Sequence, residues 1–311
     1  MKRKLMAYFS VFVILVFVAY MIWDTATFRD NRPSEVLISH AEEEDQPKDQ
    51  WSLMATIPID AGKLRSVAAT LSGEIIVGGD SYAVCYGKDL NRKWHVETSA
   101  PITALADGGN VIYAAAGEII IILSPDGRII EEWGPYEANS LITSVFSGKD
   151  RIAFADAVNK RIFILDTNGG LIGMIGQSGN HFVIPSPYFD VVLADDNTLV
   201  AANTGKHTLE IWNSSGTMIS SFGTPGTAPG SFCGCCNPAH FTKYGKNLVT
   251  AEKGINRIKV IDMNGEFIEY VSSVNDFTAS VPLDLAVSDQ IIYAANPADS
   301  KLYVFERKER Q

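Results

Sequence analysis

The chain has 311 residues, 46% hydrophobic and 20% charged, a composition that suits a globular protein with a substantial core. Its formal net charge is −10, and three of its basic residues, Lys2, Arg3 and Lys4, precede the first apolar run. Without these three, 23 basic residues face 36 acidic ones. Such a surface repels phosphate backbones and argues against nucleic acid as a partner.

Residues 5–23 form an uncharged apolar run, LMAYFSVFVILVFVAYMIW. As a helix at ~1.5 Å per residue this run spans roughly 28 Å, close to the hydrocarbon thickness of a bilayer. The run is longer than the apolar part of a signal peptide, so it predicts an uncleaved signal anchor, with a cleaved signal as the alternative. The basic residues before it would stay in the cytoplasm. We therefore expect a single-pass membrane protein whose remaining chain lies outside the cytoplasm, in the periplasm or the extracellular space.

After this run the chain changes character twice. Residues 24–50 are polar and include the acidic run at 42–45, a composition typical of a flexible stalk. From residue 51 onward, short apolar strands alternate with Gly, Asp and Asn turns. The sequence thus predicts three parts: a cytoplasmic basic tip and transmembrane anchor over 1–23, a stalk over 24–50 and a globular domain over 51–311.

The globular domain contains six copies of one repeat. Each copy is an apolar strand, a turn and a second strand that ends in small residues. These second strands end at Asp80, Ala116, Asp156, Asn203, Glu252 and Asn296. A third strand, an Asn-Gly or Ser-Gly hairpin and a fourth strand follow in several copies, so each repeat suits one four-stranded blade. The predicted fold class is all-β, a six-bladed β-propeller.

The two ends of this domain are predicted to complete one blade together. The last repeat has no fourth strand, and the strand at 51–59 has no other partner. We expect strand 51–59 to become the outer strand of the last blade, because closing the ring removes two exposed sheet edges.

The later repeats carry motifs of a known family. Residues 222–232, FGTPGTAPGSF, look like the connection FG-x-x-G-x-x-PG-x-F, and residues 256–262 and 159–166 are similar to the strand N-x-R-I-x-V-F-D. Over about residues 140–305 the chain therefore resembles the NHL-repeat family of six-bladed propellers. The resemblance implies this fold and a binding platform, since such motifs specify a fold better than a function.

One enzymatic branch of that family resembles peptidyl-hydroxyglycine amidating lyases, which hold zinc through histidines on alternate blades. Of the five histidines in this chain, only His240 lies at the start of an innermost strand. The three-histidine pattern is absent, so we do not expect lyase activity. No Cys-x-x-Cys-His motif is present, which argues against covalently attached haem.

In a propeller the innermost strand of each blade begins at the mouth of the central channel. In this register the first positions are Arg65 or Ser66, Thr103, Thr143 or Ser144, Asp190, His240 and Asp284. The candidate ligand-binding rim consists of Arg65, Asp190, His240 and Asp284. Two interpretations stay open: these side chains hydrogen-bond neighbouring loops, or they form a polar pocket for a ligand or ion.

A cysteine cluster lies just before one of these strands. Cys233, Cys235 and Cys236 fall within four residues, and His240 follows four residues later. The connection that carries them, residues 223–238, should cross the face near the channel mouth. One interpretation is a disulfide with a spare thiol. A second is a metal site, in which the thiolates and His240 hold zinc, copper or an iron–sulfur centre.

A third interpretation of the cluster is a thiol-redox site. It needs a lowered thiolate pKa, and the only nearby cation in the sequence is Lys243. The fourth cysteine, Cys85, stands in an apolar strand and is expected to be a buried packing thiol, or else a disulfide partner for the cluster.

Taken together, these patterns favour a binding module over an enzyme. A protein or a small molecule would meet the face that carries the Cys-rich connection. The alternative is a metal-binding or thiol-redox protein that uses the same connection.

Overall fold

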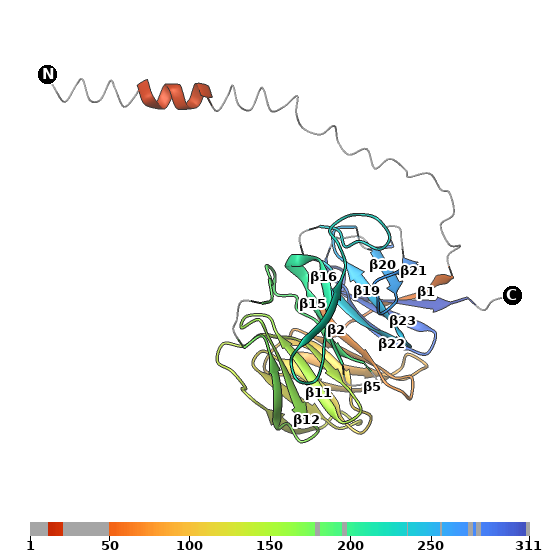
Figure 1. The fold of residues 1–311 in the computed structure, drawn as a ribbon. Coiled ribbons are helices and arrows are strands. Elements are labelled where there is room, and N and C mark those ends of the chain that lie inside the picture. Colours follow the sequence, from red (N-terminus) through yellow and green to blue (C-terminus); the bar gives the residue numbers. More distant parts are fainter. Residues whose placement is uncertain are drawn as a thin grey trace. The chain divides into compact units, whose positions relative to one another are not determined.

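The computed structural model describes residues 12–20, 50–177, 181–194, 198–234, 236–255, 257–272, 276–277 and 281–308. The chain divides into two units, Met1–Lys48 and Asp49–Gln311. In the first unit, residues 12–20 form a helix (Figure 1), and these residues are hydrophobic. Within the described residues, no helix combines the length and the apolar character that crossing a membrane requires. The rest of the predicted anchor, and residues 24–49 of the predicted stalk, lie outside the described residues.

The second unit is a ring of six antiparallel four-stranded sheets, each of which is one blade (Figure 1). The first blade contains β2 (Leu64–Ala69), β3 (Ile75–Gly79), β4 (Tyr82–Tyr86) and β5 (Arg92–Glu97). The second contains β6 (Ile102–Asp107), β7 (Ile112–Ala116), β8 (Ile119–Leu123) and β9 (Ile129–Trp133). The third contains β10 (Ile142–Ser147), β11 (Arg151–Asp156), β12 (Arg161–Asp166) and β13 (Leu171–Ile175).

The remaining three blades follow the same order from the innermost strand outward. The fourth contains β14 (Val191–Leu193), β15 (Leu199–Asn203), β16 (Thr208–Trp212) and β17 (Met218–Phe222), with the 3-10 helix η1 (Thr204–Lys206) between β15 and β16. The fifth contains β18 (His240–Tyr244), β19 (Asn247–Glu252), β20 (Arg257–Ile261) and β21 (Phe267–Ser272). The sixth contains β22 (Asp284–Ser288), β23 (Ile291–Asn296), β24 (Lys301–Arg307) and, as its outer strand, β1 (Trp51–Pro58).

The sixth blade joins the two ends of the domain. Strand β1 pairs antiparallel with β24, from Trp51 opposite Arg307 to Pro58 opposite Lys301. In Figure 1 the orange strand β1 accordingly lies among the blue strands of the last repeat. The all-β six-bladed propeller predicted from the repeats is thereby confirmed, and its closure leaves no blade with a missing strand.

The hairpins between third and fourth strands show why the turn residues are glycine. Gly127 and Gly169 have positive φ angles of 84° and 82°, which favour glycine. Each glycine also touches a tryptophan of the preceding blade, since an added Cβ would come within 2.6 Å of Trp94 or Trp133 respectively. The turn chemistry therefore serves both the hairpin and the packing between blades.

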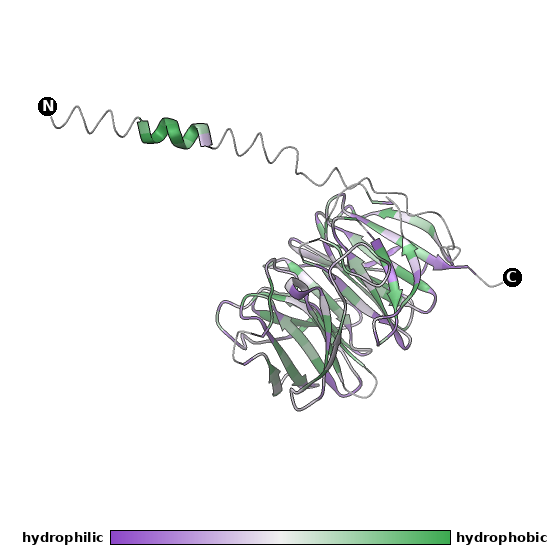
Figure 2. Ribbon diagram, turned by 45° about the horizontal axis from the view of Figure 1, so that its top comes forward, coloured by the Kyte–Doolittle hydropathy of each residue, from purple (hydrophilic) through white to green (hydrophobic). Residues whose placement is uncertain are grey.

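The hydrophobic core lies between the blades. The described residues form six buried clusters, and each joins residues of two neighbouring blades, including the junction between the sixth and the first. Figure 2 shows hydrophobic residues concentrated along the strands. Because every interface between blades is packed in this way, the innermost strands are held at fixed positions around the axis.

Candidate functional site

The inner strands are joined around the axis by side chains near their starts. In the first three blades, each hydroxyl donates to a backbone carbonyl of the next blade or of the connection leading into it. Ser66 donates to Ile102 O at 3.0 Å, Thr103 to Ile142 O at 2.5 Å and Thr143 to Phe189 O at 2.8 Å. These bonds fix the spacing of neighbouring inner strands.

In the last three blades the equivalent positions hold ionisable side chains. Asp190, His240 and Asp284 come together as a group that we call the axial cluster. His240 Nδ1 lies 3.4 Å from Asp190 Oδ2 and 3.7 Å from Asp284 Oδ1. The three side chains are 8%, 11% and 17% exposed for Asp190, His240 and Asp284 respectively, so the cluster is largely withdrawn from solvent.

Backbone groups complete the hydrogen bonding of both carboxylates. Asp190 Oδ2 accepts from Phe241 N at 2.9 Å, and Asp284 Oδ2 accepts from Val67 N at 2.8 Å. Asp190 Oδ1 accepts from the hydroxyl of Ser144. These contacts link all six blades, from the first to the sixth and back to the first. We call the linking side chains the belt: Ser66, Thr103, Thr143, Ser144, Asp190, His240 and Asp284.

Burial and charge shift the protonation of the axial cluster. Burial raises the pKa of Asp284 to about 6; the His240 charge opposes this shift and the Asp190 charge adds to it. Burial disfavours the charged form of His240, but the hydrogen bond to Asp190 and the charges of Asp284 and Asp190 outweigh it and raise its pKa. The imidazole is therefore held towards its protonated form, which donates from both nitrogens.

The axial cluster lies between two cavities on the propeller axis. The first, which we call the rim pocket, has a volume of about 380 Å³. Its polar lining consists of Lys63, Arg65, Thr103, Thr143, Tyr188 and His240. The second, which we call the channel cavity, has a volume of about 420 Å³ and includes Asp190 and Asp284 in its wall. The imidazole thus borders one cavity and the two carboxylates border the other.

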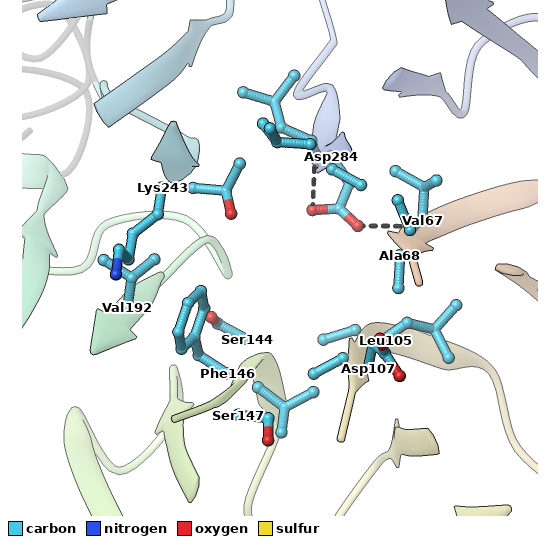
Figure 3. A pocket seen from close by; sticks show the side chains of 18 of the residues that line it. Val67, Ala68, Leu105, Asp107, Ser144, Phe146, Ser147, Val192, Lys243 and Asp284 are labelled. Carbon is cyan, nitrogen blue, oxygen red and sulfur yellow. Dashed lines mark hydrogen bonds between the residues drawn. The ribbon is translucent and has the colours of Figure 1, made fainter. Parts of the chain in front are cut away.

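Figure 3 shows the channel cavity from close by. Its wall combines polar groups with apolar side chains, and Val67, Leu105 and Phe146 are among the side chains drawn. A dashed line joins Asp284 to Val67. Lys243 belongs to this wall.

The predicted rim residues are thus distributed over both cavities. Asp190, His240 and Asp284 form the axial cluster, whereas Arg65 stands apart from it in the wall of the rim pocket. Arg65 Nε pairs with Asp80, and the two side chains are 36% and 49% exposed respectively. Ser66, the alternative to Arg65 in the sequence register, belongs to the belt.

Beneath the Cys-rich connection lies a second group of buried charges, Glu252, Arg257 and Lys259, which we call the clamp cluster. Glu252 Oε1 lies 2.8 Å from Arg257 Nε and 3.0 Å from Lys259 Nζ. Burial lowers the pKa of Lys259 to about 8, although Glu252 opposes this shift. Lys259 Nζ also lies 4.5 Å from the centre of the Phe232 ring.

The clamp cluster holds the connection by its backbone. Arg257 donates to Thr227 O and Ser231 O, both at 2.8 Å, and Lys259 donates to Pro229 O at 2.9 Å. In the opposite sense, Glu252 Oε2 accepts from Cys233 N at 2.8 Å. Arg257, the arginine of the repeat motif, therefore has a structural role, because it binds an interblade connection to the blade that follows.

Of the clustered cysteines, Cys233 and Cys236 are buried, and Cys235 lies outside the described residues. The Ser186 hydroxyl donates to Cys236 Sγ at 2.8 Å, and Lys253 Nζ lies 3.3 Å from Ser186 Oγ. The expectation that Lys243 is the only cation near the cluster was wrong, because Arg257 and Lys259 both donate to this connection. Lys243 lies in the wall of the channel cavity, whereas the fold returns Lys253 at the end of β19 to the connection.

No disulfide joins the three cysteines that the structure describes, Cys85, Cys233 and Cys236. Cys85 is buried in β4, and burial raises the pKa of its thiol to about 11. Among the described residues, no group of three or more His, Cys, Asp or Glu side chains is arranged to hold a metal ion.

Several residues of these sites were not predicted from the sequence to belong to a site. They are Lys63, Ser186, Tyr188, Glu252, Lys253 and Lys259. Lys259 did carry a signal, because a lysine in the middle of the apolar strand RIKVI needs a buried partner. Ser186 and Tyr188 carried none, since they stand in an irregular connection.

No family model matches the sequence, and a search of the curated proteins finds no match. Solved structures are similar in fold. A catalytically inactive virginiamycin B lyase from Staphylococcus aureus with quinupristin is 18% identical, with a TM-score of 0.56 over 80% of this chain and 82% of the other. A streptogramin B lyase is 12% identical, with a TM-score of 0.58 over 82% and 97%. The Pan2 WD40 domain of Neurospora crassa is 12% identical, with a TM-score of 0.57 over 86% and 98%. At these identities the likeness shows that the chain shares the β-propeller fold.

Proposed function

We propose that this chain is a membrane-anchored, extracytoplasmic propeller of the NHL type that acts as a binding module. Its ligand, a protein or a small molecule, would meet the face that carries the Cys-rich connection and the rim pocket. The observation that carries the proposal is the rim pocket itself, a cavity of about 380 Å³ whose walls come from inner strands and fixed connections. Ligand sites are typically preformed hollows of this size, with a few polar groups among apolar walls.

Side-chain contacts join the connections around the rim pocket, which favours binding. Ser186 and Tyr188 belong to the connection before β14, and this connection contacts the Cys-rich connection through the bond from Ser186 to Cys236. Tyr188 also packs edge-on against His240, with ring centres 5.8 Å apart. A surface held in this way loses little conformational entropy when a ligand binds. The neighbour solved with quinupristin supports the idea that a propeller of this shape can accommodate an organic ligand.

The binding test uses the full chain in detergent and a library of small organic molecules, read by the shift in unfolding temperature. Tyr188→Ala removes a wall of the rim pocket, and Ser147→Ala is the matched control in the channel cavity. We expect hits whose stabilisation is lost in Tyr188→Ala and kept in Ser147→Ala. Hits that depend on Ser147 instead, or on neither residue, would overturn the rim pocket as the site.

The anchor is part of this proposal. Residues 1–23 would span the membrane with the basic tip in the cytoplasm, residues 24–50 would form the stalk, and residues 51–311 would lie outside. The support is the uncharged apolar run and the basic residues before it. We expect the full chain to stay with membranes after an alkaline carbonate wash and to be cut by external protease in intact spheroplasts. Release by carbonate, or protection from the protease, would contradict this topology.

A thiol or metal function at the Cys-rich connection is the second candidate. The contact of Ser186 with Cys236, and of Lys253 with Ser186, favours it, because a nearby ammonium stabilises a thiolate. Cys233, Cys235, Cys236 and His240 would be the metal or redox residues, with zinc, copper or an iron–sulfur centre as the metal. Elemental analysis and thiol titration of anaerobically purified protein test it. A protein that contains no metal and has no reactive thiol would exclude this candidate.

A further inference from the structure

The chemistry of the rim pocket narrows the class of ligand, on the basis of the binding function proposed above. Three basic side chains line the pocket: Lys63, Arg65 and His240. Among the described residues in its wall there is no carboxylate. The chain as a whole carries 36 acidic residues against 26 basic ones, so this wall departs from the charge of the protein.

The orientation of His240 adds a hydrogen-bond donor. Its Nδ1 faces the carboxylates of Asp190 and Asp284, which leaves Nε2 as the ring nitrogen for the pocket. The two carboxylates lie in the wall of the channel cavity, on the other side of the imidazole. A ligand in the rim pocket therefore meets the imidazole edge before it meets either acid.

Arg65 offers a second set of donors. Its Nε is engaged by Asp80, and a guanidinium has four further N–H groups on Nη1 and Nη2. Two of these can bind both oxygens of a planar oxyanion side by side, a geometry that a carboxylate matches well. Lys63 adds a positive charge at the same wall.

The remaining wall suits the body of an organic molecule. Tyr188 presents an aromatic ring, and Leu141, Val281 and Pro282 present aliphatic surface. A cavity of about 380 Å³ lies at the lower end of the volumes that hold small organic ligands.

We propose that the rim pocket binds a small organic acid. Its carboxylate meets Arg65 and the Nε2 side of His240, and its body packs against Tyr188. Lys63 contributes to the attraction without a fixed geometry.

The test compares three probes of one shape, benzoate, benzamide and benzylamine, with phenyl phosphate as a fourth. Binding to the full chain in detergent is measured by calorimetry at low and at high salt. We expect saturable binding of benzoate that is at least tenfold tighter than that of benzamide, no binding of benzylamine, and weakening by salt. Tighter binding of phenyl phosphate than of benzoate would overturn the assignment to a carboxylate.

Variants locate the binding. Arg65→Gln should weaken benzoate about tenfold, because a charge-assisted bidentate contact is lost. Arg92→Gln, an exposed arginine on β5 of the same blade, is the control and should leave benzoate unchanged. Equal effects of the two variants would overturn the assignment to Arg65.

The outcomes separate this inference from the proposed function. If benzamide or benzylamine binds as well as benzoate, and Tyr188→Ala abolishes that binding, the pocket binds ligands but the acid class is wrong. If none of the four probes binds, the acid class is wrong and the proposed function is decided by the library screen alone.

Discussion

Two groups of buried charges in this propeller are built differently. In the clamp cluster, Glu252 lies within 3.0 Å of both of its cations, and both cations also reach backbone carbonyls of the Cys-rich connection. In the axial cluster, His240 lies 3.4 and 3.7 Å from its two carboxylates, and cavities adjoin the group on both sides. In the clamp cluster every charge is engaged by several short contacts, and the cluster holds the connection in place. In the axial cluster the carboxylates are engaged by backbone groups, while the imidazole is less closely paired and borders the rim pocket.

The largest effect is expected from breaking the clamp cluster. Glu252→Gln leaves Arg257 and Lys259 buried without their shared anion, which should lower the free energy of unfolding by about 3–5 kcal/mol. Urea denaturation measures this loss. The control is Glu266→Gln, an exposed glutamate in the same blade, which should change the value by less than about 0.5 kcal/mol. A loss below about 1 kcal/mol in Glu252→Gln would show that the clamp cluster is not structural.

The axial cluster should instead reveal itself through pH. The pKa of Asp284 is raised to about 6 in the folded protein, so the folded state binds this proton more tightly than the unfolded state does. The contribution of Asp284 is therefore fully present at low pH and is lost as pH rises from about 4 to about 6. Compared with Asp284→Asn, the wild-type protein should lose about 2 kcal/mol of stability over this range.

Asp262→Asn supplies a control of opposite sign. Partial burial acts to raise the pKa of Asp262, but hydrogen bonds from the backbone of Glu266 and Asn264 outweigh it and lower the pKa. Its stabilisation should be present at neutral pH and lost as pH falls. Denaturation curves at several pH values measure both variants, and a wild-type protein that gains stability relative to Asp284→Asn as pH rises would refute the assignment.

The smallest effect concerns the contact between the connection before β14 and the Cys-rich connection. Ser186→Ala removes the bond to Cys236 and should cost only about 0.5–1.5 kcal/mol, because the clamp cluster still holds the connection. Hydrogen exchange over residues 223–238 should therefore stay close to wild type. Exchange that rises as far as it does in Glu252→Gln would mean that Ser186, and not the clamp cluster, fixes the connection.

The architecture could be predicted from the order of the residues alone. The repeat, the Asn-Gly and Ser-Gly hairpins and the unpartnered first strand predicted six blades, because strand periodicity and turn chemistry are local properties of the chain. The sequence register also placed Asp190, His240 and Asp284 at equivalent positions of their blades. These predictions needed no knowledge of side-chain contacts.

Which of those residues contact one another became apparent from the folded chain. Asp190 and Asp284 are 94 positions apart in the chain, yet both approach the imidazole of His240. Arg65 instead pairs with Asp80 and lines the rim pocket, whereas the two carboxylates line the channel cavity. The same holds for Lys253, Arg257 and Lys259, which contact the Cys-rich connection although only Lys243 was expected near it. These contacts depend on the curvature of the ring and on the direction of each side chain. Neither can be predicted from the spacing of residues along the chain.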